Sequence, residues 1–291
     1  MSATASVQLC HIMILFPNAK INIGLDILRR RDDSYHDLET VMIPVPWTDI
    51  LEIVPARGES DTLTCTGRPV NCPPEKNLVM KAIRALREVV DFPAADIYLE
   101  KIIPDGAGLG GGSADASFAI AGVNSLFGLG LDKRQMAEVA ARIGADCPFF
   151  IYNEPMLCTG TGTTLHRFPL SLPQPVWIAI VKPDVSVTTA EAYRGVHPAV
   201  PDVLLADRLR DTPFSRWQQV IGNDFEHSIF PAHPAIAAVK EELLGQGAAY
   251  SAMSGSGSAV YGIFMNDSLF KPLPHWDCYF YKELQIPGAG A

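Results

Sequence analysis

The 291-residue sequence lacks several features that mark common classes of protein. Lysine and arginine total 23 against 32 acidic residues, and a net charge of −9 argues against nonspecific binding of nucleic acid. The six cysteines form no Cys-x-x-Cys pair and no zinc spacing, so we expect reduced thiols in a cytoplasmic protein. The apolar run 11–16 is too short to span a membrane and has no basic lead, so we expect no membrane partner.

Two familiar phosphate-binding motifs are also absent. No Gly-Lys pair occurs, which excludes a Walker-type loop. Neither His-Arg-Asp nor Asp-Phe-Gly occurs, which excludes a protein kinase.

A dinucleotide-binding fingerprint is harder to dismiss. Gly106, Gly108 and Gly111 have its spacing, and Asp132 lies about 20 residues further on, where an acidic ribose ligand is expected. The preceding segment 96–103 alternates polar and apolar residues, whereas the strand before a dinucleotide loop is apolar throughout. Asp132 is also typical of a helix N-cap. A nicotinamide-dependent oxidoreductase is therefore the less favoured alternative.

A glycine-rich loop is the most informative segment that the chain does contain. Five glycines lie within 106–112, and Ser113 then opens an apolar, helix-compatible segment. Glycine allows a backbone to approach a ligand closely, and a helix N-terminus attracts anions. The predicted phosphate site comprises Pro104, Asp105, Gly106, Ala107, Gly108, Leu109, Gly110, Gly111, Gly112, Ser113 and Ala114.

The segment 19–27 predicts a strand with one buried face. Its odd-numbered residues are apolar, while Lys20 and Asn22 lie side by side on the other, polar face. The remaining patterns predict strands at 38–44, 49–54, 176–181, 249–253, 259–264 and 276–281, and helices at 77–90, 113–127, 133–143, 189–193 and 236–244. This order indicates an α+β fold with a boundary near residue 165. The tail 287–291 is expected to be disordered.

Several segments together resemble a known superfamily. They are 17–25, 35–40, the loop 104–114, 143–150 and 253–260. The loop resembles the second motif of the GHMP kinases, which include galactokinase, homoserine kinase and mevalonate kinase. The first and last segments resemble the first and third motifs. The resemblance covers about residues 13–264, so residues 1–12 read as an extension or a misassigned start.

This resemblance implies a two-domain GHMP kinase fold with the active site in the cleft between the domains. Residues 13–165 would form a ribosomal-protein-S5-like, ATP-binding domain, and residues 166–285 a ferredoxin-like α/β-plait domain. The segments 35–40 and 143–150 resemble the branch that uses ATP to phosphorylate the 2-hydroxyl of a cytidine diphosphate-linked methylerythritol in non-mevalonate isoprenoid synthesis. The alternative is a homoserine or mevalonate type of kinase. Magnesium is expected, with no identifiable ligand, and no oligomeric state is indicated.

Asp146 and Lys20 are the catalytic candidates. A carboxylate beside the acceptor hydroxyl can take its proton, and the family carries an aspartate at this position. Asp146 is equally typical of a helix N-cap, since it precedes Cys-Pro. The Lys20 ammonium would lower the pKa of Asp146 or stabilise the oxygen or phosphate. A strand lysine is otherwise usually just solvated.

The remaining candidates concern recognition of the substrate and the nucleotide. By resemblance, Tyr35 and Tyr193 would stack on cytosine, His36 would bond to it, and Asn22 would contact substrate; each alone also suits packing. The Gly255–Ser256 turn suits phosphate contact or a tight hairpin, and Asn77 suits base contact or helix capping.

Two positions depart from the family pattern. Ser34 replaces a usual glycine, which predicts strain if the turn needs a positive φ. Ala114 replaces a usual serine, which removes one hydroxyl near the phosphates or metal.

Overall fold

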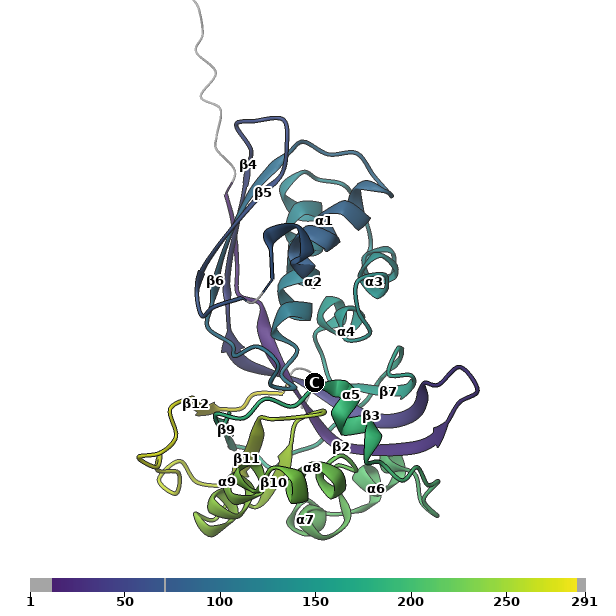
Figure 1. Cartoon of the computed structure of the whole chain (residues 1–291), viewed down its shortest axis with the longest axis vertical. Coiled ribbons are helices and arrows are strands. Elements are labelled where there is room, and N and C mark those ends of the chain that lie inside the picture. Colours follow the sequence, from purple (N-terminus) through teal and green to yellow (C-terminus); the bar gives the residue numbers. More distant parts are fainter. Residues whose placement is uncertain (1–11, 71, 287–291) are drawn as a thin grey trace, which may run out of the picture.

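The computed structural model describes residues 12–70 and 72–286, which form two lobes (Figure 1). The strands are β1 (Met13–Leu15), β2 (Asn18–Arg30), β3 (His36–Thr48), β4 (Ile50–Pro55), β5 (Thr62–Gly67), β6 (Ala95–Lys101), β7 (Met156–Gly160), β8 (Thr164–Arg167), β9 (Trp177–Val181), β10 (Tyr250–Met253), β11 (Val260–Phe264) and β12 (Tyr279–Glu283). The helices are η1 (Pro74–Lys76), α1 (Leu78–Arg87), α2 (Gly111–Leu126), α3 (Lys133–Ala141), α4 (Cys147–Tyr152), α5 (Thr189–Arg194), α6 (Leu205–Asp211), η2 (Phe214–Arg216), α7 (Trp217–Val220), α8 (Glu226–Ala232) and α9 (Pro234–Gly245).

One lobe consists of the sheet β1-β4-β6-β5 and the helices α1 to α4 (Figure 1). The strand β6 alternates between buried and more exposed residues, as its sequence predicts, because helices cover only one face of this sheet. Leu51 and Ile97 of that face pack with Ile83 of α1 and Ile120 of α2 in one apolar core. This lobe supplies the glycine loop, which connects β6 to α2.

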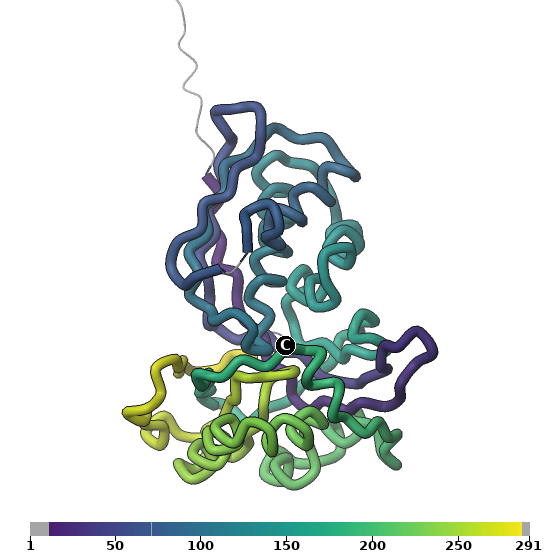
Figure 2. The backbone as a smooth tube through the Cα atoms, in the orientation of Figure 1, coloured from purple at the N-terminus to yellow at the C-terminus, as the bar shows by residue number. Residues whose placement is uncertain are grey.

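The other lobe contains the sheet β10-β11-β9-β12, with α8 and α9 on it, and the long β2–β3 hairpin crosses the junction of the two lobes (Figure 1, Figure 2). That hairpin belongs to the sheet β2-β3-β7-β8. Ile21 and Val41 of the hairpin share an apolar core with Ile180 of β9 and Tyr261 of β11. Contacts on both sides of residue 165 therefore build this core, and the division into 13–165 and 166–285 stays a prediction.

The strand β2 differs from its prediction in one respect. Its sequence pattern predicts one buried face, but ten consecutive residues from Asn18 to Ile27 are buried. The polar face carrying Lys20 and Asn22 is covered by the glycine loop and the turn near Gly255. Alternation reveals which side chains share a face, whereas burial of the second face depends on segments remote in sequence.

The helix α2 also begins earlier than predicted. Ser113 was expected to open it, but the helix starts at Gly111, and its N-cap is Gly110 with a φ of +71°. A glycine at this N-cap adopts the left-handed conformation without a Cβ clash, and Phe150 would lie 2.8 Å from such a Cβ.

Other local predictions are confirmed. Asp132 caps α3 in a capping box with Gln135, so it does not sit where a ribose ligand of a dinucleotide fold would. Ser34 has a φ of +69°, which is the left-handed region that favours glycine. Predicted strand 276–281 is found at 279–283, and the expectations for residues 1–11 and 287–291 lie outside the described residues. None of the described helices is long and apolar enough to cross a membrane.

Candidate active site

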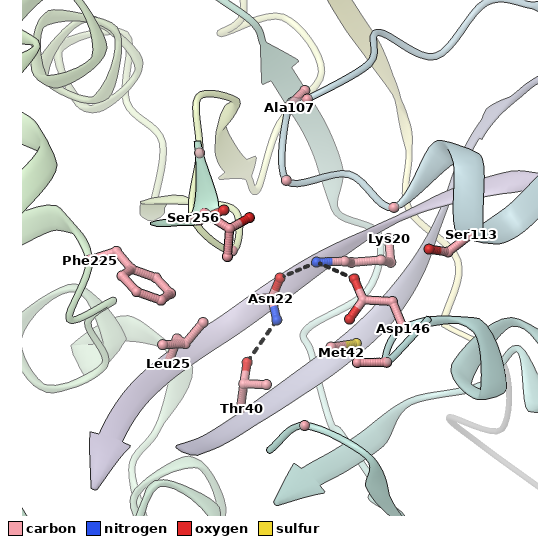
Figure 3. A pocket seen from close by; sticks show the side chains of 18 of the residues that line it. Lys20, Asn22, Leu25, Thr40, Met42, Ala107, Ser113, Asp146, Phe225 and Ser256 are labelled. Atoms are coloured by element: carbon pink, nitrogen blue, oxygen red, sulfur yellow. Dashed lines mark hydrogen bonds and ion pairs between the residues drawn. The ribbon is translucent and has the colours of Figure 1, made fainter. Parts of the chain in front are cut away.

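A cavity of about 400 Å³ lies at the junction of the two lobes. Its walls come from the polar face of β2, the glycine loop, the start of α4 and the turn between β10 and β11 (Figure 3). The helix α5 also contributes to them through Thr189 and Tyr193. The predicted site residues that line it are Lys20, Asn22, Pro104, Asp105, Gly106, Ala107, Gly108, Gly110, Gly111, Gly112, Ser113, Asp146, Tyr193, Gly255 and Ser256. Segments separated by more than two hundred positions thus meet in one pocket.

The glycine loop is held by main-chain contacts on both sides. The Lys20 amide donates to the Leu109 carbonyl at 2.9 Å, and the Ala259 amide donates to the Ala107 carbonyl at 3.1 Å. At Gly108 a Cβ would lie 2.0 Å from the Ser254 carbonyl oxygen, so this position accepts only glycine. The loop delivers the first turn of α2 to the cavity without any side-chain cap, which leaves a helix N-terminus facing the pocket.

Lys20 and Asp146 meet on the floor of the cavity, where the Lys20 Nζ lies 3.5 Å from Asp146 Oδ2 (Figure 3). The Lys20 side chain is 4% exposed and the Asp146 side chain is 34% exposed. The carboxylate is therefore the member of the pair that is open to the cavity.

Asp146 occupies the N-cap position of α4 but makes no capping hydrogen bond. Two observations explain this. Its backbone is α-helical, with φ −82° and ψ −15°, instead of extended as in most N-caps, and Pro148 removes one of the amides that a cap would accept from. The capping role that the sequence left open is absent, and the carboxylate points to Lys20 instead.

The far end of the cavity is aromatic. The rings of His36 and Tyr193 stack with centroids 4.8 Å apart and an interplanar angle of 22°. The Tyr193 ring meets Phe225 edge-on at 4.9 Å, and burial raises the pKa of Tyr193, so its phenol stays neutral. Tyr35 is 66% exposed, and neither it nor His36 lines the cavity, although His36 adjoins it through Tyr193.

The turn containing Gly255 and Ser256 belongs to the connection between β10 and β11, and it lines the cavity opposite the glycine loop. Its contact with phosphate stays a prediction. The Asn223 side-chain amide donates to the carbonyls of Met253 and Gly255, each at 2.8 Å. Asn223 is 3% exposed and also accepts from the Phe225 amide, so one residue braces the turn and the aromatic wall.

Some predicted site residues lie elsewhere. Asn77 caps α1 by accepting from the Val79 amide at 2.9 Å, and it lines a separate hollow of about 290 Å³ with Cys65 and Cys72. The side chains of Leu109 and Ala114 are buried among apolar residues, so only their backbone belongs to the loop.

Thr40 and Phe225 also line the cavity, although no sequence motif predicted a role for either. Thr40 stands inside the 35–40 motif, but no local pattern marks a single threonine or phenylalanine as a wall residue.

The site offers few side-chain ligands for the magnesium ion that the resemblance implies. Among the described residues, no group of three His, Cys, Asp or Glu side chains could hold a metal ion. The carboxylates that line the cavity are Asp105 and Asp146. Mg²⁺ commonly binds through one or two carboxylates together with substrate phosphates, so the residues present fit a metal that arrives with a nucleotide.

Comparison with protein families agrees with this geometry. The model described as the GHMP kinases N terminal domain matches residues 77–154, and the one described as GHMP kinases C terminal matches residues 208–271. A crystal structure of 4-(cytidine 5'-diphospho)-2C-methyl-D-erythritol kinase matches with a TM-score of 0.74 and 30% identity, covering 88% of this chain and 92% of that one. Mevalonate kinase from L. major, at 13% identity and a TM-score of 0.69, shares the fold.

Curated relatives narrow the class further. The 4-diphosphocytidyl-2-C-methyl-D-erythritol kinase of Parabacteroides distasonis is 47% identical over 271 residues, covering 93% of this chain and 98% of the relative. The protein of the same name from Porphyromonas gingivalis is 46% identical over 275 residues, covering 94% and 99%. The chain belongs to the 4-diphosphocytidyl-2-C-methyl-D-erythritol kinase family of the GHMP kinases. The expected two-domain fold and the expected class, an ATP-dependent small-molecule kinase, are confirmed.

Proposed function

We propose that this chain transfers the γ-phosphoryl group of ATP to the 2-hydroxyl of 4-diphosphocytidyl-2-C-methyl-D-erythritol in the non-mevalonate isoprenoid pathway. The observation that carries the proposal is the cavity itself. A cap-free helix N-terminus, an open carboxylate beside a buried ammonium, and an aromatic wall line one space. These features suit a triphosphate, a reacting hydroxyl and a nucleobase, in that order along the cavity.

The triphosphate would bind at the glycine loop and the first turn of α2. The helix N-terminus favours negative charge, and the loop backbone approaches closely because three of its glycines adopt positive φ. The Gly255 turn closes the opposite side, where a Cβ at Gly255 would lie 3.4 Å from the Lys20 Nζ. The hollow beside Asn77 is the natural extension for the nucleoside, at the start of α1.

Asp146 is the proposed general base. The acceptor oxygen attacks the γ-phosphorus as its proton moves to the Asp146 carboxylate, and the bond from that phosphorus to the β,γ-bridging oxygen breaks to release ADP. The Lys20 ammonium stabilises negative charge on the transferring group and on the oxygen under attack. Mg²⁺, when bound with the nucleotide, would neutralise phosphate charge, and Asp146 and Asp105 are the available carboxylates.

The aromatic wall is the proposed cytosine site. His36 and Tyr193 already lie within stacking distance of each other, and Tyr35 extends from the adjoining hairpin. Binding of cytosine would bring Tyr35 and Tyr193 onto the faces of its ring and His36 onto its edge. Asn22 would contact the acceptor closer to the general base, Asp146.

A coupled assay of ADP release against a panel of acceptors tests the function. The expected result is turnover with 4-diphosphocytidyl-2-C-methyl-D-erythritol, and little with homoserine or mevalonate. If that acceptor is inert while homoserine or mevalonate turns over, the specific substrate is wrong and the kinase class stands. Titration with NADH against a nonhydrolysable ATP analogue addresses the oxidoreductase alternative, for which we expect no NADH binding.

A further inference from the structure

A chain of buried hydrogen bonds runs from the main chain of β2 to the Lys20 ammonium (Figure 3). Lys20 Nζ donates to Asn22 Oδ1 at 2.6 Å, and Asn22 Nδ2 donates to Thr40 Oγ1 at 3.0 Å. The Thr40 hydroxyl in turn donates to the Gly24 carbonyl at 2.6 Å. Each of these three side chains belongs to a residue that is at most 3% exposed, so water does not substitute for the links.

These hydrogen bonds can run from donor to acceptor in only one direction. A carbonyl oxygen only accepts, so the Thr40 proton must go to Gly24, and the hydroxyl then has lone pairs left to accept from an amide. An ammonium only donates, so Asn22 must present its oxygen to Lys20. A flipped amide would place NH₂ against NH₃⁺ and would leave Thr40 facing an oxygen with no proton to offer.

A β-bulge makes the Gly24 carbonyl available for this purpose. Ile23 pairs with Val41 and Leu25 pairs with Thr40, so Gly24 is an extra residue on β2. Its φ is +68°, and a Cβ there would lie 2.4 Å from Leu205 Cδ1. The glycine therefore permits the bulge, and the bulge turns one carbonyl away from the strand ladder toward the Thr40 side chain.

Thr40 and Lys20 together fix how the Asn22 side chain is turned, because Thr40 accepts from its NH₂ group and Lys20 donates to its oxygen. The main chain of Asn22 is held separately, because the Tyr261 hydroxyl donates to the Asn22 carbonyl at 2.7 Å. Rotation of the side-chain amide is limited by its two hydrogen bonds, and Thr40 anchors the end of the amide that lies away from Lys20.

We propose that Thr40 is a positioning residue for the Lys20 ammonium, acting through the amide of Asn22. The proposal rests on the proposed function, in which Lys20 stabilises the transferring phosphoryl group. Thr40 orients Asn22, Asn22 holds the ammonium at one point, and the ammonium keeps its remaining protons for Asp146 and the phosphate.

Thr40→Val tests this role, because valine keeps the branched shape that suits a strand and removes only the hydroxyl. We expect kcat to fall about 10- to 100-fold, as is typical when a catalytic group is misplaced by about 1 Å. The KM values for ATP and acceptor, and the Kd of a nonhydrolysable ATP analogue, should stay within about threefold. Thr40→Ser, which keeps the hydroxyl, should retain kcat within about threefold of wild type.

Three results would overturn the proposal: Thr40→Val with near-normal kcat, a loss confined to KM, or a Thr40→Ser enzyme as impaired as Thr40→Val. If Thr40→Val does not fold, Thr40→Cys takes its place against Thr40→Ser, since a thiol of similar size is a weak hydrogen-bonding group. The acceptor panel with the wild-type enzyme separates failure of the proposed function from failure of the proposed role of Thr40. A different preferred acceptor overturns the proposed substrate, and the Thr40 series is then measured with that acceptor.

Discussion

Two buried lysines lie beside the start of α2, Lys20 near Gly110 and Lys101 near Gly111, and their surroundings differ. Lys101 is clasped between Asp49 Oδ2 at 2.5 Å and Asp115 Oδ2 at 2.7 Å. Lys20, at the cavity, has an amide oxygen at 2.6 Å and the Asp146 carboxylate at 3.5 Å. Both carboxylates of the first cluster are at most 3% exposed, whereas Asp146 is 34% exposed.

The difference separates a lysine that holds the fold from one that is available to a ligand. Burial alone would lower the pKa of Lys101, but Asp115 and Asp49 outweigh it and raise that pKa. Asp49 also accepts from the amides of Ile102 and Ile103, so this cluster ties the end of β6 to α2 just before the glycine loop. The carboxylates around Lys101 are enclosed, whereas the Asp146 carboxylate beside Lys20 can still accept hydrogen bonds from the cavity.

The largest expected effect on activity is at the pair of Lys20 and Asp146, which faces the cavity. Asp146→Asn removes the proposed base and should lower kcat by about 10²- to 10⁴-fold. Lys20→Met removes charge stabilisation and should lower kcat by about 10²- to 10³-fold. Steady-state ADP release measures both. Near-normal kcat in either variant removes that residue from the mechanism.

Substitutions in the Lys101 cluster should instead lower the stability of the fold. Lys101→Met removes the ammonium that Asp49 and Asp115 share, and losing one partner of a buried ion pair typically costs about 3–5 kcal/mol of unfolding free energy. Lys20→Met is the matched control, because the partly exposed Asp146 becomes hydrated. The cost should be smaller, about 1–3 kcal/mol for the buried Asn22 oxygen that loses its donor. Urea unfolding of the two variants measures the contrast. Equal losses would show that both lysines serve the fold.

Adding Asp115→Asn to Lys101→Met should restore part of the lost stability. The double variant removes the buried Asp115 carboxyl group that has lost its Lys101 donor, and Asp49 keeps its two backbone donors. We expect a recovery of about 1–3 kcal/mol, the usual desolvation penalty of an unsatisfied buried group. No recovery in urea unfolding would mean that Lys101 stabilises the fold through its packing and not its charge.

A smaller effect concerns pH. Burial raises the pKa of Asp115 to about 8 from a usual value of 3.8, against the opposing attraction of Lys101. The folded state therefore holds a proton that the unfolded state releases, so this contribution to stability is complete below about pH 4 and declines as pH rises toward 8. In thermal melts from pH 5 to 8, Asp115→Asn should show a shallower decline than wild type. Parallel curves of melting temperature against pH for the two proteins would contradict this role of Asp115.

Much of the site was predictable because its parts are local in sequence. The glycine loop, the neighbouring Lys20 and Asn22 on one strand face, and the Asp132 cap depend on spacing and backbone conformation within a few residues. The start of α2 was misplaced by two positions. Its N-terminus lies at Gly111 because a glycine N-cap with positive φ fits against Phe150, a contact that helix propensity does not contain.

Contacts between distant segments were not predictable. Phe225 reaches the cavity because β2 pairs with the segment around Asn223, and that asparagine bonds to the turn at Gly255. Whether Asp146 caps its helix was also undecided until its backbone angles and its distance to Lys20 were known.

By itself, the order of residues determined which backbone can approach a phosphate, which helix end is open, and which side chains share a strand face, since these follow from steric limits and strand or helix periodicity. The tertiary structure alone decided that one lysine is enclosed by two carboxylates and another is left facing a cavity. That choice depends on what packs against each ammonium from other segments, because burial and the distance to opposite charge set the electrostatics of a buried group.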